Sequence, residues 1–324
     1  MKTLRTLALS GVAVIAGAMG ALAQDLPVIR LATLEIGTVN WELTTIKENG
    51  LDEKNGFTLE IQSYADNGAT RVALEGGAAD VAVADWIWVA RQRAAGKDYV
   101  VVPYSKAVGG LVVPEDSTAQ SLEDLKGAKI GIAGGPLDKS WLILRAYAQQ
   151  EYGMDLKAET EQVFGAPPLI FKSGLSGETQ GAINFWHFLA KMKAAGMREL
   201  ISVDTASRGL GLDPETPLLG YVLKESFLAE HPDLGHALYR ASRDAKDLLA
   251  SDDAAWEAVR DQMNVQNDAQ FETLKADFIA GIPLDQPVSR AGADALLKVM
   301  AELGGEELVG QATSLPEGLF LDDE

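Results

Sequence analysis

The sequence contains no cysteine among its 324 residues. This absence excludes disulfide bonds, thiolate metal sites and a catalytic thiol, and it also excludes the lipid-bearing cysteine of a membrane-anchored lipoprotein. Histidine is scarce, with three residues, and none of them is spaced as one of a pair of metal ligands. The fold must therefore be held by hydrophobic cores, and the chain is long enough to form one or two of them.

Long apolar runs are absent after the first residues of the chain. Lys2 and Arg5 precede an apolar stretch from Leu7 to Ala23, which is 17 residues long and broken by glycines. A membrane-spanning helix needs about 20 residues. The stretch ends in Ala-Leu-Ala, a small-x-small cleavage pattern, so we expect residues 1–23 to be a signal peptide and the mature chain to begin at Gln24.

Positive charge is in the minority. Lys and Arg number 28 against 47 Asp and Glu, which gives a formal net charge of −19, and removal of the signal peptide makes it more negative by two. An acidic surface repels nucleic acids and anionic lipids, so neither is an expected partner. Two interpretations of the charge remain: it keeps an exported protein soluble, or it attracts a cationic ligand.

Motifs of catalysis are also missing. The sequence has no zinc motif, nucleophile elbow or phosphate loop, and its acidic residues do not follow the spacing of an EF-hand. No cofactor is therefore expected. We expect a protein that is not an enzyme, because no spacing of its acidic residues ties them to a reaction.

Strands alternate with helices in the first part of the mature chain. Apolar and alternating runs predict strands over 28–33, 57–61, 80–85 and 100–104, and the segments between them predict helices over 41–51, 67–75 and 86–95. This β-α-β-α-β order predicts a doubly wound α/β unit, with a parallel sheet covered by helices on both faces.

A second α/β unit begins near Gly109. It is expected to contain strands over 110–114 and 129–133, a weaker strand at Phe164, and helices over 121–127 and 140–152. The segment 178–193 is expected to be mostly helical with a break around Asn184. The chain is expected to return near 209–220 to a strand over 218–223. Everything after Glu225 is expected to be helical, including a helix with Pro232 at its first position.

Three segments carry a resemblance to a known family. They are "LEGGAADVAVAD" (74–85), "SLEDLKGAKIGIAGG" (121–135) and "FLAEHPDL" (227–234). With the signal peptide, they resemble the type II periplasmic binding proteins of ABC importers, in the branch for aliphatic sulfonates, nitrate and thiamine precursors. The leucine-lysine-glycine segment before the first strand of the second lobe is the most specific of these matches.

The resemblance implies two doubly wound α/β lobes joined by two crossings, with a ligand held between them. On this basis residues 24–108 and 214–324 would form lobe 1 and residues 109–213 lobe 2. It also implies a periplasmic, monomeric protein that is not embedded in the membrane. Its partners would be a small-molecule ligand and an ABC permease with its ATPase at the inner membrane.

Candidate ligand-binding residues follow from a general rule. In open α/β sheets, ligands bind beyond the carboxyl ends of the strands, where loops and helix N-termini converge. Four strand-to-helix junctions and a weaker fifth supply the candidates: Glu35, Gly37, Thr38 and Trp41; Asp66 and Asn67; Asp85 and Trp86; Gly135, Leu137, Asp138, Ser140 and Trp141; and Asn184.

Each junction also has a plain structural interpretation. Trp41 suits core packing as well as ligand stacking, because tryptophan buries a large area in either role. Asp66 suits a helix N-cap. Trp86 is expected to stack on a ligand and Trp88 to lie in the core. Asn184 would face the cleft if a short strand, and not a helix, precedes it.

Acidic residues at the junctions indicate the ligand's chemistry. Glu35, Asp66, Asp85 and Asp138 would repel an anion, whereas an aromatic and acidic pocket suits a cation or a nitrogen heterocycle such as a thiamine-precursor-like pyrimidine. The alternatives are a sulfonate or other small anion, a metal ion or metal complex, and a sensor lobe for a membrane receptor. Eukaryotic thiamine-pyrimidine synthases resemble the same fold, but they use a cysteine-rich segment that is absent here.

Overall fold

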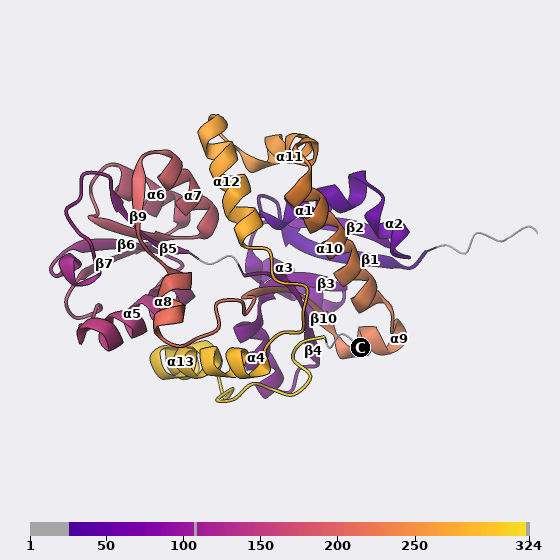
Figure 1. Cartoon of the computed structure of the whole chain (residues 1–324). Helices are drawn as coiled ribbons and strands as arrows, with labels where there is room; N and C mark the ends of the chain where they lie inside the picture. Colours follow the sequence, from indigo (N-terminus) through magenta and orange to yellow (C-terminus); the bar gives the residue numbers. More distant parts are fainter. Residues whose placement is uncertain (1–25, 107–108, 322–324) are drawn as a thin grey trace, which may run out of the picture.

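A computed structural model describes residues 26–106 and 109–321. The predicted signal peptide at 1–23 and the start of the mature chain at Gln24 lie outside the described residues. The described chain folds into two lobes, each built around a five-stranded sheet (Figure 1). No helix among the described residues has the length and apolar character of a membrane span.

Lobe 1 contains the sheet formed by the first four strands and a late one. The strands are β1 (Val28–Leu34), β2 (Thr58–Tyr64), β3 (Val81–Asp85), β4 (Tyr99–Ser105) and β10 (Leu219–Lys224), in the order β2-β1-β3-β10-β4. The helices connecting its first strands are α1 (Val39–Glu48), α2 (Leu51–Lys54), α3 (Asn67–Gly76) and α4 (Trp86–Ala94). Strands β2 and β3 pair with β1 in parallel.

Lobe 2 repeats this order with its own five strands. They are β5 (Gly110–Pro114), β6 (Lys129–Ala133), β7 (Glu161–Gly165), β8 (Gly181–Asn184) and β9 (Met197–Ser202), in the order β7-β6-β8-β5-β9. The helices are η1 (Glu123–Leu125), α5 (Lys139–Tyr152), α6 (Pro167–Leu175), α7 (Trp186–Ala194) and α8 (Val203–Gly209). Strands β7 and β8 pair with β6 in parallel.

Both sheets are mixed. Strands β1 to β4 all run in the same direction, as the β-α-β-α-β order predicts, and the late strand β10 is the antiparallel member of the lobe 1 sheet. Strand β10 runs antiparallel to β3 and β4, and β5 runs antiparallel to β8 and β9. These two strands follow the two crossings between the lobes: β5 begins just after Gly109, and residues 210–218 lead into β10. A strand that enters a sheet from the other lobe arrives without a crossover helix, so it has no reason to run parallel to its neighbours.

Two local predictions were wrong. The segment 178–193 is not mostly helical, because its buried residues 181–184 form strand β8 and only residues 186–194 form a helix. Pro232 is not the first residue of a helix, since α10 begins at Leu234 with Asp233 at its N-cap position.

The chain after β10 is helical for most of its length. It contains α9 (Glu225–Glu230), α10 (Leu234–Ser251), α11 (Asp253–Val259), η2 (Arg260–Met263), α12 (Asp268–Ala280) and α13 (Arg290–Val309). Its end departs from the expected helix, because Phe320 forms a parallel bridge with Val101 of β4.

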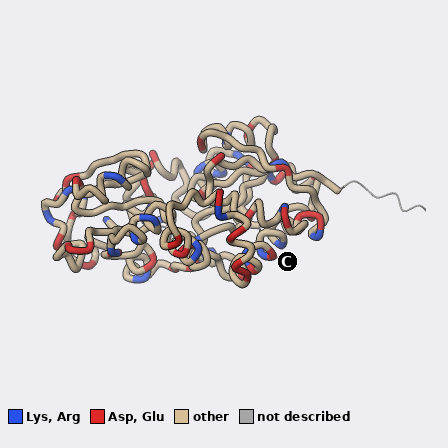
Figure 2. The backbone as a smooth tube through the Cα atoms, turned by 90° about the horizontal axis from the view of Figure 1, so that it is seen from above, with Lys and Arg blue, Asp and Glu red and all other residues tan. Residues whose placement is uncertain are grey.

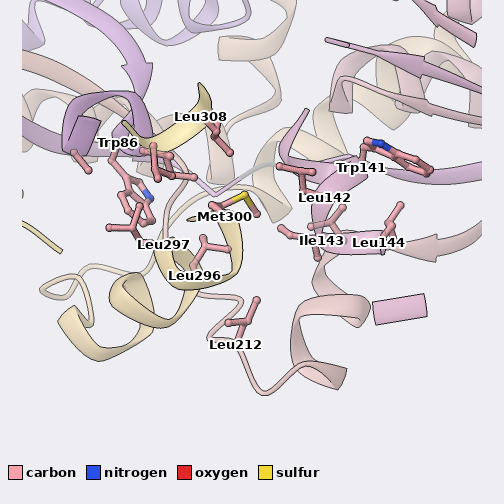
Figure 3. Close-up of a cluster of buried hydrophobic side chains, with 14 of the residues drawn as sticks. Trp86, Trp141, Leu142, Ile143, Leu144, Leu212, Leu296, Leu297, Met300 and Leu308 are labelled. Atoms are coloured by element: carbon pink, nitrogen blue, oxygen red, sulfur yellow. The ribbon is translucent and has the colours of Figure 1, made fainter. Parts of the chain in front are cut away.

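Two of these late helices join the lobes. Helix α12 packs on α7 of lobe 2, and α13 packs on both α4 of lobe 1 and α5 of lobe 2 (Figure 1). Figure 3 shows the resulting hydrophobic cluster, in which Met300 and its neighbours on α13 lie between Trp86 of α4 and Ile143 of α5. One apolar core therefore continues from lobe to lobe.

A buried polar network ties α1 to α10 beneath the sheet of lobe 1. The Glu42 carboxylate accepts hydrogen bonds from Tyr221 at 2.7 Å, Ser242 at 2.6 Å and the Lys246 ammonium at 2.6 Å. Glu42 and Ser242 are fully buried and Lys246 is 2% exposed. Burial lowers the pKa of Lys246, and the Glu42 and Asp247 carboxylates oppose this effect.

We expect Lys246→Met to lower the free energy of unfolding by about 3–5 kcal/mol, because it leaves the Glu42 charge buried without a cation. The double variant Glu42→Gln with Lys246→Met should be clearly more stable than Lys246→Met alone, since a neutral amide still accepts from Tyr221 and Ser242. Urea denaturation of the three proteins measures both differences. A double variant that is less stable than Lys246→Met alone would contradict this account.

Candidate functional site

A cavity of about 370 Å³ lies between the lobes, beside the two crossings. Helices α4, α5, α7, α8, α12 and α13 and the second crossing contribute to its wall. The lining residues are Ile87, Lys106, Gly109, Lys139, Ile143, Trp186, Leu189, Lys193, Glu199, Ser202, Val203, Asp204, Ser207, Leu212, Asp213, Pro214, Thr216, Leu218, Asp277, Ala280, Gly281, Leu296 and Met300.

The lysines of the cavity wall are all neutralised by carboxylates. The ion pairs and their N–O distances are Lys106–Glu215 at 2.7 Å, Lys139–Asp85 at 3.2 Å and Lys193–Asp277 at 2.7 Å. These cations are therefore engaged within the protein, and an anionic ligand would have to compete with a carboxylate for each of them.

Two acidic residues of the wall have no such partner. Glu199 and Asp213 form no ion pair with a described residue, whereas Asp204 is held by Arg208 at 3.0 Å. Elsewhere acidic and basic residues are distributed over both lobes, as Figure 2 shows along the backbone. The cavity wall therefore holds two carboxylates that form no ion pair with a described residue, although Asp213 lies close enough to Arg208 to help raise the pKa of that guanidinium.

The hydroxyl of Thr216 is the clearest sign of a missing partner. Thr216 lines the cavity and is 8% exposed, and its Oγ1 atom is buried without a hydrogen bond. A buried hydroxyl without a partner lowers stability by roughly 1–3 kcal/mol.

Gly109, the residue before β5, is packed closely against the end of β8. A Cβ atom at Gly109 would lie 2.5 Å from the carbonyl oxygen of Asn184, so only glycine fits there. The Gly109 amide donates to Oγ of Ser140 at 3.3 Å. Ser140, a predicted ligand residue, is thus buried and bound to the first crossing beside the cavity.

At the first predicted junction, Glu35, Gly37 and Thr38 lie in the loop after β1, whereas Trp41 lies in the core. Glu35 is exposed and its amide donates to the Tyr64 carbonyl, while Gly37 donates to the Leu34 carbonyl in the same turn. Thr38 stands at the N-cap position of α1, where its side chain makes no capping bond. These residues shape the loop that follows β1.

Trp41 belongs to an aromatic cluster that joins the lobes. It is 3% exposed, and its ring centroid lies 5.8 Å from that of Trp186 on α7 and 5.9 Å from that of Phe278 on α12. The packing interpretation of Trp41 therefore holds in this structure, and Trp186 is the member of the cluster that reaches the cavity wall.

At the second predicted junction, Asp66 caps the N-terminus of α3. Asp66 accepts a hydrogen bond from the Ala69 amide at 2.9 Å, and both Asp66 and Asn67 are exposed at the start of α3. Neither side chain lines the cavity, so the structure supports the capping interpretation of Asp66.

The third junction contains Asp85 and Trp86. Asp85 caps α4 through the Trp88 amide at 2.9 Å and also binds Lys139 of lobe 2. Trp86 is fully buried against Phe320, whereas Trp88 is half-buried and stacks on Tyr99. The expectation that Trp86 stacks on a ligand is corrected, because its ring is enclosed by the core.

The fourth junction is a turn that caps α5. Gly135 has a positive φ of 85°, and Asp138 accepts from the Trp141 amide at 3.0 Å. Leu137 packs on the core and Trp141 is 1% exposed within it. Trp141 is thus a core residue, which corrects its prediction as a ligand contact.

Asn184 ends strand β8, as the alternative interpretation required. Its side chain is 2% exposed and is fully engaged, donating to the Pro167 carbonyl at 3.0 Å and accepting from the Phe185 amide at 2.9 Å. It therefore positions the turn before α7 and leaves no atom for a ligand.

None of the predicted residues lines the cavity, although several lie next to residues that do. Lys139 follows Asp138, Ile87 follows Trp86, and Trp186 lies two residues after Asn184. The residues that sequence reasoning missed lie on the crossings and late helices, such as Asp213, Thr216 and Asp277. The return of the chain near 209–220 was recognised in the sequence, and it was the one signal that pointed to them.

A metal centre has little support in this arrangement. Within residues 26–106 and 109–321, no three His, Asp or Glu side chains come together in a way that would hold a metal ion. Asp66, Asp85 and Asp138 instead cap helices, and Asp204, Glu215 and Asp277 form ion pairs with arginine or lysine.

Comparison with known families identifies the family of this chain. The family model described as NMT1/THI5 like matches residues 40–255, which include most of lobe 1's first part and all of lobe 2. The chain belongs to the NMT1/THI5-like family. A search of curated protein sequences gives no match.

Solved structures share the fold of this NMT1/THI5-like protein. The periplasmic aliphatic sulphonate binding protein SsuA from Escherichia coli has a TM-score of 0.70 at 17% identity, covering 92% of this chain and 94% of that chain. The alkanesulfonate-binding protein SsuA from Xanthomonas axonopodis pv. citri, bound to MOPS, has a TM-score of 0.67 at 18% identity, covering 92% and 99%.

An enzyme has the fold of the NMT1/THI5-like protein as well. The desulfurization enzyme DSZB has a TM-score of 0.58 at 14% identity, covering 90% of this chain and 97% of that chain. The fold alone therefore does not decide between binding and catalysis.

We expect Asp138→Asn to stabilise the protein at pH 7 by about 1–3 kcal/mol. Burial raises the pKa of Asp138 to about 6, so its ionisation opposes folding. The unfolded carboxyl ionises near pH 3.9, so the stability of the wild type should fall as pH rises from about 4 to 6. The gain in the variant should therefore vanish below pH 4, as measured by denaturation at a series of pH values.

The matched control is Asp66→Asn, which replaces an exposed N-cap carboxylate by the same amide. A comparable gain at Asp66 would show that burial is not the cause.

Proposed function

We propose that this protein is the periplasmic substrate-binding component of an ABC import system, which captures a small organic molecule between its lobes and delivers it to a permease and its ATPase. Membership of the NMT1/THI5-like family and the likeness to SsuA-type binding proteins support this role. Two lobes joined by two crossings suit closure around a ligand by hinge bending.

The interlobe cavity is the proposed ligand site. Its volume of about 370 Å³ lies within the range of small-molecule pockets, roughly 300–1,000 Å³. The observation that carries the proposal is the buried, unpartnered hydroxyl of Thr216 on the cavity wall. Folding leaves this group without a hydrogen bond, and a bound ligand is the partner that would satisfy it.

The charges of the wall support a cationic or nitrogen-heteroaromatic ligand, such as a thiamine-precursor-like pyrimidine. Glu199 and Asp213 form no ion pair with a described residue, whereas Lys106, Lys139 and Lys193 are already paired. Trp186 adds an aromatic ring beside these carboxylates. A sulfonate would meet two free carboxylates and no free lysine on this wall.

Binding without chemical change is the expected activity. Among the described wall residues the acidic side chains are paired with cations or face the cavity singly, and His187 is buried among aromatic rings with its pKa lowered to about 4 by burial. A neutral histidine enclosed by Trp186 and Phe188 does not reach the cavity as an acid or base.

A thermal-shift screen of the chain from Gln24 tests the ligand class. The probes are thiamine, 4-amino-2-methylpyrimidine, choline and methanesulfonate, and a probe at 100 times its dissociation constant should stabilise the fold by about 2.7 kcal/mol. We expect stabilisation by a cationic or heteroaromatic probe that is weakened at least tenfold in Glu199→Gln with Asp213→Asn. Asp204→Asn is the control, because Asp204 also lines the cavity but is paired with Arg208. Stabilisation by methanesulfonate alone would contradict the proposed class.

Thr216→Val separates ligand binding from folding. We expect this variant to be at least as stable as the wild type without ligand, because it removes a buried hydroxyl that has no partner, and to bind the active probe about 5–100-fold more weakly. Calorimetry and denaturation give the two quantities.

Thr45→Val is the matched control, since the buried Thr45 hydroxyl already donates to the Trp41 carbonyl at 2.8 Å. It should lose stability and keep its affinity. A Thr216→Val variant with unchanged affinity would place the ligand elsewhere.

A further inference from the structure

An ion pair joins the two lobes where two helices begin. Asp85 is the N-cap of α4 in lobe 1, and Lys139 is the first residue of α5 in lobe 2. The Lys139 ammonium lies 3.2 Å from Oδ2 of Asp85, and the two side chains are 24% and 12% exposed. The pair is therefore largely removed from water at the meeting point of the lobes.

The position of Lys139 is unfavourable for the helix that carries it. The N-terminus of a helix bears partial positive charge, so a cation in the first turn is repelled by the helix macrodipole. The adjacent N-cap, Asp138, is engaged with the Trp141 amide. Helix stability thus gives no reason for a lysine here, and its contact with Asp85 is the interaction that accounts for it.

Asp85 keeps one oxygen for a cation from outside its own lobe. Oδ1 accepts from the Trp88 amide at 2.9 Å, so Oδ2 is the atom left for Lys139. Within lobe 1 the nearest cation is Arg71, 4.0 Å away and held over the Trp88 ring at 4.6 Å. Without Lys139, the Asp85 carboxylate, whose side chain is 12% exposed, would keep only the longer ion pair with Arg71.

Lys139 also separates Asp85 from the cavity. Lys139 lines the cavity wall, whereas Asp85 does not. Ile87 and Ile143, from the first turns of the same two helices, line the wall beside it. A cationic group that enters the cavity would therefore reach Asp85 only by displacing the lysine.

We propose that Lys139 is an internal stand-in for the cationic group of the ligand. While the cavity is empty, Lys139 forms an ion pair with Asp85 that holds the two lobes together. When a competing cation binds to Asp85, this ion pair breaks. This inference rests on the proposed function for the ligand's class. It adds Asp85 to Glu199 and Asp213 as a carboxylate that meets the ligand's cation, and Lys139 sets how strongly a competing cation must bind.

Chemical rescue with n-butylammonium, which has the chemistry of the lysine side chain, tests this proposal without knowledge of the natural ligand. We expect Lys139→Ala to bind n-butylammonium at least tenfold more tightly than the wild type does, as measured by calorimetry. The gain should be absent from Lys139→Ala with Asp85→Asn, because the amide retains the N-cap but carries no charge. Lys139→Gln provides a second variant. Its side chain is longer than that of alanine and fills more of the space left by the lysine, so the gain in affinity for n-butylammonium should be smaller than in Lys139→Ala.

Lys129→Ala is the matched control, since Lys129 pairs with Glu161 at 3.4 Å within lobe 2. Small-angle scattering gives an independent readout: Lys139→Ala should have a larger radius of gyration than the wild type, and n-butylammonium should reverse the change. Equal affinity for n-butylammonium in the wild type, in Lys139→Ala and in the variant that also lacks Asp85 would overturn the proposal. Rescue at Asp85 together with a failed thiamine, pyrimidine and choline screen would instead reject the proposed nutrient class and leave this site standing.

Discussion

The insertion of one antiparallel strand into each sheet is the constraint on which the rest of the structure depends. Strand β10 is hydrogen-bonded between β3 and β4, and β5 between β8 and β9, so each crossing ends in a strand that is held on both sides. The crossings are thereby fixed at the face where the helix N-termini of both lobes meet. The cavity, the cross-lobe ion pair and the unpartnered Thr216 hydroxyl all lie at this boundary.

Polar side chains at this boundary divide into those that serve the fold and those that remain for a ligand. Asp66, Asp85 and Asp138 each accept a backbone amide at a helix start, which satisfies groups that the helix itself leaves free. Glu199 in β9 and Asp213 on the second crossing do not cap a helix, although Asp213 accepts the Glu215 amide at 3.0 Å. A carboxylate at a strand-to-helix junction is therefore a weaker indication of ligand binding than one away from a helix start.

Much of the fold could be predicted from the sequence, and little of the site. The strands of lobe 1 follow from apolar alternation, but strand direction depends on the route of the chain between lobes, which no local pattern records. Residues 181–184 form a strand too short for periodicity to distinguish from a helix. The residues of the cavity wall escape sequence reasoning for a related reason. Lys193 and Asp277 meet across 84 positions of sequence, and the residue types of Trp86 and Trp141 do not reveal that the core encloses both.

The placement of β10 also sets an order of assembly. Lobe 2 takes all its strands from residues 110–202, so its sheet can form from a continuous piece of chain. The sheet of lobe 1 has a gap between β3 and β4 until residues 219–224 arrive, after the whole of lobe 2. Contacts that are distant in sequence form slowly, because the intervening loop must first close. Lobe 2 is accordingly the part that matures first, and lobe 1 keeps open strand edges, which are prone to aggregation, until its last strand is in place.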